Sequence, residues 1–374
     1  MNPSIITRIK AFIKKETVFT IAILLAIVSA FFVHPSLDYV SYIDFRVLSI
    51  LFCLMMLVAG LREQWIFRRL AEKLTTLVGG SKGLELILVL LCFFSSMIIT
   101  NDVALITFVP FALALMNGAG LHHRIIRVIT LETIAANLGS MLTPIGNPQN
   151  LYLYNISGMS FSSFIRLMLP LSIASLVLLI ASVLIGKSEP INVSFEKADT
   201  NINKRKLIII GILFVICMGT VARLIPWQIS FACVFITSLV VFRNLFKDVD
   251  YYLLGTFVGF FVFIGNMQQI PTISRMINEL LSGRELLLST ALSQIISNVP
   301  ASMLLAGFTE NYSALLYGVN IGGLGTLIAS LASLISYKFY AVTADSKKGQ
   351  YLLTFSIWNI VYLIILIPLA IYLI

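Results

Sequence analysis

Long apolar stretches, separated by short polar segments, run along most of the chain. A helix that crosses a bilayer needs roughly 17 to 25 mostly apolar residues, and about nine stretches meet this requirement. The stretches at 125–156 and 313–336 contain helix-breaking residues and are expected to form broken spans. The predicted full spans are 18–34, 45–61, 125–156, 161–186, 207–223, 227–243, 251–269, 313–336 and 351–373. We therefore expect an all-α polytopic membrane protein.

Two further apolar segments, 84–117 and 285–308, each have a polar tip near the centre. The tips are Thr100-Asn101-Asp102 and Ser297-Asn298-Val299-Pro300. Two short apolar arms around a polar tip suit a re-entrant hairpin, which enters and leaves the bilayer on one side. Backbone that leaves the helix at membrane depth is tolerated only where it is buried or lines a cavity. At each tip, polar side chains are expected to cap the helix that follows.

The order of these motifs recurs about 200 residues later, which predicts two structural repeats. Asp44 opens the second span and Asp250 the seventh, so equivalent spans are an odd number apart and run in opposite directions. Interrupted helices at matching places in two inverted halves are typical of the binding site of a secondary transporter. The aligned positions of the two broken spans are Asn137 with Asn320, Gly139 with Gly322, and Thr143 with Thr326.

This alignment divides the chain into three parts. Residues 1–186 form the N-terminal repeat with a cytoplasmic hairpin, and residues 187–223 form a cytoplasmic linker and a linking span. Residues 224–374 form the C-terminal inverted repeat with an external hairpin. Amphipathic helices at 62–77 and 270–281 are expected to lie at the membrane interface beside the two hairpins.

Composition and charge support a membrane protein. Hydrophobic residues make up 59% of the chain and charged residues 11%, against about 25% charged residues in soluble domains. The net charge of +9 does not indicate nucleic-acid binding, because most Lys and Arg residues fall in loops on one side of the threading. This places the N-terminus in the cytoplasm and the C-terminus outside the cell membrane. The exceptions are Arg46, Arg166, Arg223, Arg275 and Arg284.

Arg8, Lys10, Lys14 and Lys15 precede the first apolar stretch. No small-residue cleavage site follows that stretch, so we interpret it as a span and not as a removed signal peptide.

Both hairpin tips are predicted to be helix N-termini, and the positive end of a helix dipole favours an anion. Asn137, Asn320, Thr143 and Thr326 would add side-chain oxygens beside the tips, the ligand type that Na⁺ prefers. The glycines of the broken spans have a second interpretation, which is close packing of helices through small residues.

Asp102 and Glu132 are the acidic residues that the threading places well inside the membrane. An ionisable side chain at that depth costs free energy, so each of these residues is a candidate for a functional role. Either residue could bind the coupling cation or carry a proton. For Glu132, a structural hydrogen bond to a neighbouring backbone amide is an alternative. The three histidines, His34, His122 and His123, fall in loops, so no metal site beyond Na⁺, and no other cofactor, is expected.

The two tips and the run Asn-Leu-Gly-Ser-x-x-Thr-Pro-Ile-Gly-Asn-Pro-Gln-Asn at 137–150 resemble the signature of the ion transporter superfamily. That group includes divalent anion/sodium symporters, citrate transporters, arsenite permeases and a sodium/proton antiporter branch. The resemblance implies a mobile transport domain that moves like an elevator beside a scaffold, which commonly forms a homodimer. Position 102 is Asp and position 299 is Val, which differs from the Ser-Asn-Thr tips of dicarboxylate symporters and is closer to the arsenite permeases.

The resemblance also implies site residues, with substrate between the tips. The implied substrate-binding residues are Asn101, Asp102, Thr143, Asn298, Val299 and Thr326. The implied cation-binding residues are Thr100, Asn101, Asn137, Gly139 and Thr143 for one site, and Ser297, Asn298, Asn320, Gly322 and Thr326 for the other.

Our first hypothesis is a secondary active transporter, not an enzyme, that moves a small anion across the bilayer together with Na⁺ or H⁺. The alternative is a sodium/proton antiporter in which Asp102 exchanges the proton. A passive channel is the third hypothesis. No serine and histidine pair shares a depth in the predicted threading, which disfavours an intramembrane hydrolase, and no P-loop indicates a primary pump.

Overall fold

A computed structural model describes residues 12–13, 16–75, 79–191, 203–344 and 346–374. Within these residues every regular element is a helix, and strand pairing is limited to one isolated bridge between Gly80 and Pro190. The prediction of an all-α protein is confirmed. Arg8, Lys10, Lys14 and Lys15, and much of the predicted linker, lie outside the described residues.

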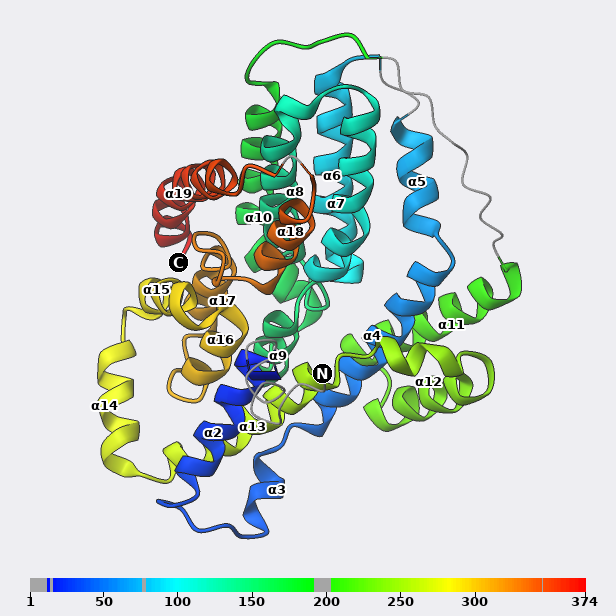
Figure 1. Ribbon diagram of the computed structural model, residues 1–374. Helices are drawn as coiled ribbons and strands as arrows, with labels where there is room; N and C mark the ends of the chain where they lie inside the picture. Colours follow the sequence, from blue (N-terminus) through cyan, green and yellow to red (C-terminus); the bar gives the residue numbers. More distant parts are fainter. Residues whose placement is uncertain (1–11, 14–15, 76–78, 192–202, 345) are drawn as a thin grey trace, which may run out of the picture.

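The first half of the chain forms two groups of helices joined by α5 (Figure 1). Their bounds are α2 (Thr17–Ser29), α3 (Asp38–Tyr42), α4 (Phe45–Glu63), α5 (Ile66–Thr75), α6 (Ser81–Ile99), α7 (Asn101–Gly118), η1 (His122–Arg124), α8 (Ile125–Ser140), α9 (Pro148–Ile156) and α10 (Phe161–Leu184).

The second half follows a similar order after α11. Its elements are α11 (Lys204–Val221), α12 (Trp227–Val241), η2 (Arg243–Asp248), α13 (Tyr251–Gln268), α14 (Pro271–Leu281), α15 (Glu285–Ile296), α16 (Asn298–Ala306), α17 (Tyr312–Ile321), α18 (Leu331–Ala341) and α19 (Lys348–Leu373).

Six helices of the described chain are long and apolar enough to cross a membrane: α4, α6, α7, α10, α13 and α19. Four of them, α4, α10, α13 and α19, coincide with predicted spans. The other predicted spans form shorter helices, such as α2 and α12, or two pieces, such as α8 with α9 and α17 with α18. The chain is therefore a multi-pass membrane protein, and nine full spans remain a prediction.

The two segments with polar tips each form a pair of packed helices, α6 with α7 and α15 with α16. The pairs differ in length. Helices α15 and α16 have 12 and 9 residues, as expected for short arms. Helices α6 and α7 have 19 and 18 residues, because regular helix continues outward from Thr100 to Ser81 and Gly118. By length and composition, these two arms could cross a bilayer, which the sequence did not suggest.

Helices from the two halves exchange partners. Helix α2 packs against α13, and α12 packs against α4, so these elements form one body together with α11. The helix pairs and the broken helices form a second body around α8, which packs against α6, α7, α10, α18 and α19. The short helices α5 and α14 connect the two bodies at the positions of the predicted amphipathic helices (Figure 1).

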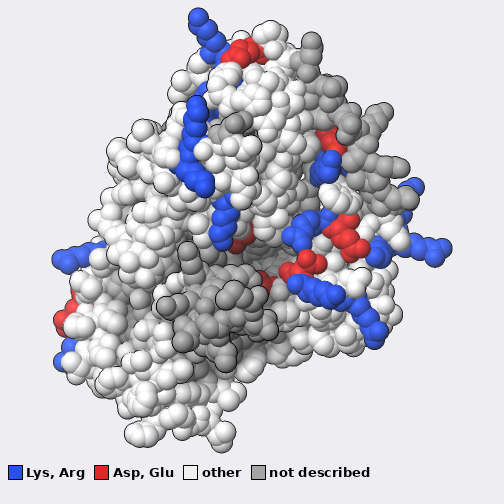
Figure 2. Space-filling model, in the orientation of Figure 1, with Lys and Arg blue, Asp and Glu red and all other residues white. Residues whose placement is uncertain are grey.

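Charged side chains are unevenly distributed over the surface. On the face that Figure 2 shows, many of them gather beside the ends of α4, α11 and α12, whereas large areas carry none. Many large apolar side chains are exposed on α10, α12 and α19, as expected for surfaces that face lipid.

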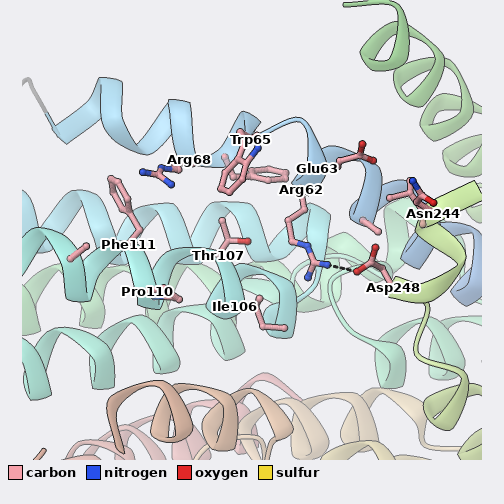
Figure 3. A pocket seen from close by; sticks show the side chains of 14 residues that line it. Arg62, Glu63, Trp65, Arg68, Ile106, Thr107, Pro110, Phe111, Asn244 and Asp248 are labelled. Carbon is pink, nitrogen blue, oxygen red and sulfur yellow. Dashed lines mark hydrogen bonds and ion pairs between the residues drawn. The ribbon is translucent and has the colours of Figure 1, made fainter. Parts of the chain in front are cut away.

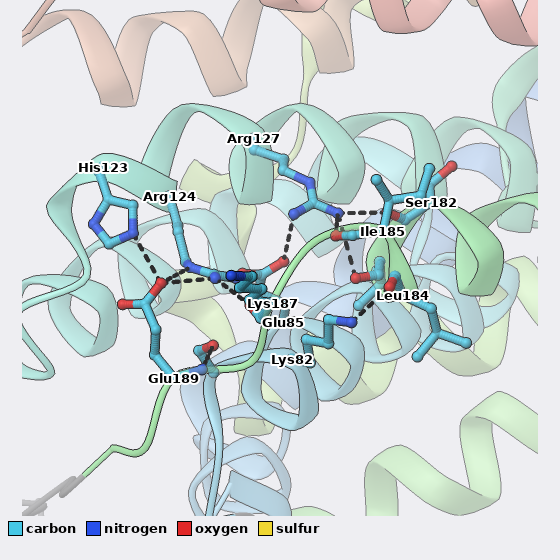
Figure 4. Close-up of polar contacts among 12 residues, drawn as sticks. Lys82, Glu85, His123, Arg124, Arg127, Ser182, Leu184, Ile185, Lys187 and Glu189 are labelled. Carbon is cyan, nitrogen blue, oxygen red and sulfur yellow. Dashed lines mark hydrogen bonds and ion pairs between the residues drawn. The ribbon is translucent and has the colours of Figure 1, made fainter.

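Several basic residues that the sequence assigned only to topology hold helices together (Figure 4). Arg124 binds the fully buried Glu85 at 2.6 Å and Glu189 at 2.8 Å. Arg127 donates to the carbonyl of Ile185 at 2.9 Å, and Lys82 donates to that of Leu184 at 2.6 Å. These cations satisfy carbonyl groups at the C-terminal end of α10, where a helix has no internal donors left.

Candidate functional site

The two tips have the same unusual backbone conformation. Thr100 has φ 71° and ψ 153°, and Ser297 has φ 75° and ψ 153°. Neither residue caps the following helix with its side chain, so the predicted cap at Thr100 is wrong. Of the other predicted caps, Asn101 accepts at Oδ1 from the amide of Asp102 at 3.0 Å. The first amide of each helix donates to a broken span. Asn101 N bonds to Gly146 O at 3.2 Å, and Asn298 N bonds to Ala329 O at 2.9 Å.

Each broken span is also tied to the helix that precedes its tip. The hydroxyl of Thr143 donates to the carbonyl of Met97, and the hydroxyl of Thr326 donates to that of Gln294 at 2.9 Å. Met97 and Gln294 occupy matching positions before the two tips. The breaks of the two halves therefore fold onto their helix pairs in the same way.

Buried asparagines connect the two breaks to each other. Asn137 Oδ1 accepts from Asn101 Nδ2 at 3.0 Å and from Ser330 Oγ at 2.9 Å. Asn320 Oδ1 accepts from Asn147 Nδ2 at 3.2 Å. Each aligned asparagine thus accepts a hydrogen bond from the break of the other half. Ser140 links the two sets of bonds, because its hydroxyl donates to the carbonyl of Asn137 at 2.9 Å and accepts from Asn147 Nδ2 at 3.1 Å. The predicted residues Asn101, Asn137 and Asn320 therefore share one network.

The glycines of the breaks allow close approach. A Cβ at Gly139 would lie 2.1 Å from the carbonyl oxygen of Phe93, and one at Gly322 would lie 2.7 Å from Ser293 Oγ. At Gly323, a Cβ would lie 2.8 Å from Asn298 Nδ2. Close packing, the second interpretation given to these glycines, accounts for their geometry.

A cavity of about 380 Å³, here called the inner cavity, lies between α4, α7, α9, α13 and α18. It reaches the first tip through Thr100, Asp102 and Asn147, but the second tip does not line it. Ser297, Asn298 and Val299 are buried elsewhere, and Thr326 lines a different hollow between α15 and α19. Of the implied site residues, only Thr100 and Asp102 line the inner cavity.

The inner cavity has acidic walls. Oδ1 of Asp102 is buried and has no hydrogen-bond partner in the described part of the chain. Asp248, Asp250 and Glu16 also line the cavity, and its two basic residues are Arg62 and Lys338. From the sequence, Arg62 and Lys338 count among the basic residues that set the orientation in the membrane, and Asp250 lies at the start of a span. Nothing in the local sequence indicates that these residues line the same cavity as Asp102.

Glu132 lies in the body formed around α8, away from the inner cavity. It is fully buried, and among the described residues neither of its carboxyl oxygens has a hydrogen-bond partner. The alternative of a structural bond to a neighbouring amide is therefore wrong. Arg127, one turn away, binds carbonyl groups at the end of α10 instead. The hydroxyl of Tyr351 is likewise buried without a partner in this part of the structure.

Residues 5–312 match the family described as citrate transporter. An uncharacterized transporter of Methanocaldococcus jannaschii is 32% identical over 338 residues, which cover 88% of this chain and 90% of the relative. The inner membrane protein YbiR of Escherichia coli is 31% identical over 329 residues, which cover 86% and 87%. A silicon efflux transporter of Oryza sativa subsp. japonica is 32% identical over 139 residues, which cover 37% of this chain and 28% of the relative. The resemblance that the motifs carried is confirmed, and the chain belongs to the citrate transporter family of membrane transporters.

Proposed function

We propose that the protein is a secondary active transporter that moves a small anion across the cell membrane together with Na⁺ or H⁺. The observation that carries this proposal is the pair of helix tips at Thr100 and Ser297, each bound to a broken helix, with the two breaks joined through Asn137 and Asn320. Paired interruptions of this kind line the binding sites of secondary transporters.

The same observations support inverted repeats and an elevator-type movement. The two helix pairs and two breaks have matching hydrogen bonds, and the first helices of each half pack onto the other half. In this proposal, the body formed by α2, α4 and α11 to α13 is the scaffold, and the body around α8 moves past it with both tips. The N-terminus is cytoplasmic, the C-terminus is external, and the scaffold forms a homodimer.

Cation binding would require a rearrangement of the asparagine network. Oδ1 of Asn137 accepts hydrogen bonds from Asn101 and Ser330, so its lone pairs are already engaged. A Na⁺ ion at this oxygen would replace at least one of these donors. A change of this kind at Asn101 would link cation binding to the position of the first tip.

The test is uptake by proteoliposomes under imposed Na⁺ or H⁺ gradients. Citrate, succinate, sulfate and arsenite form the panel, and silicic acid is added because one relative is a silicon efflux transporter. Asn101→Ala and Asn298→Ala should abolish gradient-driven accumulation while the protein stays folded. Asn278→Ala, an exposed position on α14, is the control. Wild-type uptake in both tip variants would refute the site, and flux without accumulation would indicate a channel.

A sodium/proton antiporter is the second candidate, and the unpartnered oxygen of Asp102 in an acidic cavity favours it. An acidic wall attracts cations and repels multiply charged anions. In that case Na⁺ flux should depend on the pH gradient and not on any anion. Asp102→Asn should abolish this exchange, whereas Glu132→Gln tests the other buried carboxyl group separately.

A further inference from the structure

Two cavities meet at one ion pair at the end of α4. An outer cavity of about 660 Å³ lies between this end, α5, α7 and η2 (Figure 3). It shares four lining residues with the inner cavity: Ala59, Arg62, Ile106 and Asp248. Arg62 and Asp248 therefore stand where one cavity passes into the other.

The guanidinium of Arg62 is only partly occupied. Nη2 donates to Asp248 Oδ1 at 2.8 Å, and the described chain supplies no other acceptor to this side chain. A guanidinium carries five N–H donors in a planar fork. The side chains of Arg62 and Asp248 are 38% and 40% exposed, so the remaining donors can be reached by a solute.

The other charges of the two walls do not offer the same site. Lys338 lines the inner cavity only, and its ammonium group is a point charge that lacks the planar fork of a guanidinium. Arg68 of the outer cavity donates to Glu72 at 2.9 Å and lies over the ring of Trp65. Further inside, Asp102 and Asp250 make no ion pair within the described chain and would repel an anion. An anion that moves from the outer cavity toward Thr100 meets the fork of Arg62 before it meets these carboxylates.

We propose that Arg62 binds the anionic group of a small carboxylate or oxyanion at this junction, in competition with Asp248. An anion would use the free N–H donors in the two-bond geometry that arginine favours with carboxylates and oxyanions. Asp248 occupies one donor and weakens the site, so the bound anion can leave again. Arg62 would then select cargo by its charge, and this role rests on the proposed anion transport. The binding of an anion to Arg62 does not depend on that proposal.

The test measures binding on the purified full-length protein at low ionic strength, with citrate and sulfate as separate probes. Melting temperature against probe concentration gives the dissociation constant. Asp248→Asn should tighten binding of at least one probe about tenfold or more, and Arg62→Gln should weaken it by a similar factor, as expected for charge-assisted hydrogen bonds. The double variant should bind like Arg62→Gln, because Asp248 acts only through Arg62.

Lys204→Gln is the matched control. It leaves the Lys206–Glu63 ion pair untouched and removes an exposed positive charge at the start of α11, and Lys204 lines neither cavity. The control should leave binding unchanged. The inference is overturned if Asp248→Asn binds both probes like the wild type, if it binds neither at millimolar concentration, or if the double variant binds like Asp248→Asn.

Transport separates this inference from the proposed function. If binding follows the expected pattern but proteoliposomes accumulate no anion, the Arg62 site stands and the transport proposal fails. If Arg62→Gln accumulates an anion with an unchanged KM, the transport proposal stands, and the role of Arg62 in selecting the charge of the cargo fails.

Discussion

Thr100 and Ser297 have nearly identical backbone angles, with φ of 71° and 75° and ψ of 153° in both, although they lie in different halves of the chain. Non-glycine residues rarely adopt this region, and such strain costs on the order of 1–3 kcal/mol and gathers at functional sites. In both halves the residue turns the chain between two packed helices, so that the next amide reaches the broken span. The matching strain supports a shared role for the two tips.

Thr100→Gly should stabilise the protein by roughly 1 kcal/mol, because relief of strain exceeds the added flexibility of the unfolded chain. No hydrogen bond of the Thr100 hydroxyl would be lost within the described structure. Thr107→Gly, at an ordinary position of α7, should instead destabilise by about 1 kcal/mol. Melting temperatures in one detergent compare them, and a lower value for Thr100→Gly would contradict the strain.

Gly139→Ala should destabilise the protein by about 1–3 kcal/mol, since the new methyl group would collide with the backbone carbonyl of Phe93 at 2.1 Å. The control is Gly211→Ala in α11, where nothing lies within 4 Å of the added carbon. That change should be neutral or stabilising by up to about 1 kcal/mol. Equal melting temperatures for the two variants would show that α8 can move away from α6.

Local sequence was enough to predict the tips and the breaks. Asn, Gly and Pro inside apolar segments weaken helices wherever they occur, and the repetition of the motifs placed Asn137 and Asn320 in equivalent positions. The exchange of bonds between the two breaks follows that pattern. The helical fold was equally accessible, because apolar length determines it.

The acidic inner cavity could not be predicted in this way. Arg62, Asp248 and Lys338 come from elements far apart in sequence, and only the packing of the two bodies gives them one wall with Asp102. Glu85 was missed for the same reason, since its partner Arg124 is 39 residues away in sequence. The inner cavity reaches the first tip and not the second. This difference depends on how the two bodies of helices are arranged, which no local motif encodes.

The two breaks also satisfy their carbonyl groups with different residues. In the first break, Asn150 Nδ2 donates to the carbonyls of Met141 and Thr143, each at 3.2 Å. In the second, Gln294 Nε2 donates to those of Gly322 and Leu324 at 3.0 and 2.9 Å. Both breaks leave backbone carbonyls without helical donors, but the amide side chains that bind them come from different helices. An alignment of the two halves therefore does not reveal these donors.

Gln294→Met gives the second half the residue that stands at the matching position of the first. The change should destabilise the protein by about 2–3 kcal/mol, because the carbonyls of Gly322 and Leu324 lose their donor while partly buried. Gln350→Met, at an exposed position at the start of α19, is the control. Thermal unfolding compares the two, and a Gln294→Met variant as stable as the control would mean that water replaces the amide.

Glu189 predicts a pH dependence of stability. Hydrogen bonds from Arg124, and then from His123, lower the pKa of its carboxyl group below the ordinary value. A group whose pKa is lowered by folding stabilises the protein above its unfolded pKa, and this contribution disappears as the pH falls through the lower, folded value. Glu189→Gln should therefore unfold at a lower temperature than the wild type at pH 7, and the difference should shrink below about pH 4.5, the ordinary value for this group.

Glu279→Gln, an exposed change on α14, controls for the loss of a negative charge and should show no such trend. High salt should also reduce the difference at pH 7, because Glu189 is reached by solvent. A gap between wild type and Glu189→Gln that stays constant from pH 7 to well below pH 4 would mean that Glu189 acts through its shape and not its charge. In that case the cations Arg124, Arg127 and Lys82 would hold the end of α10 without help from the charge of Glu189.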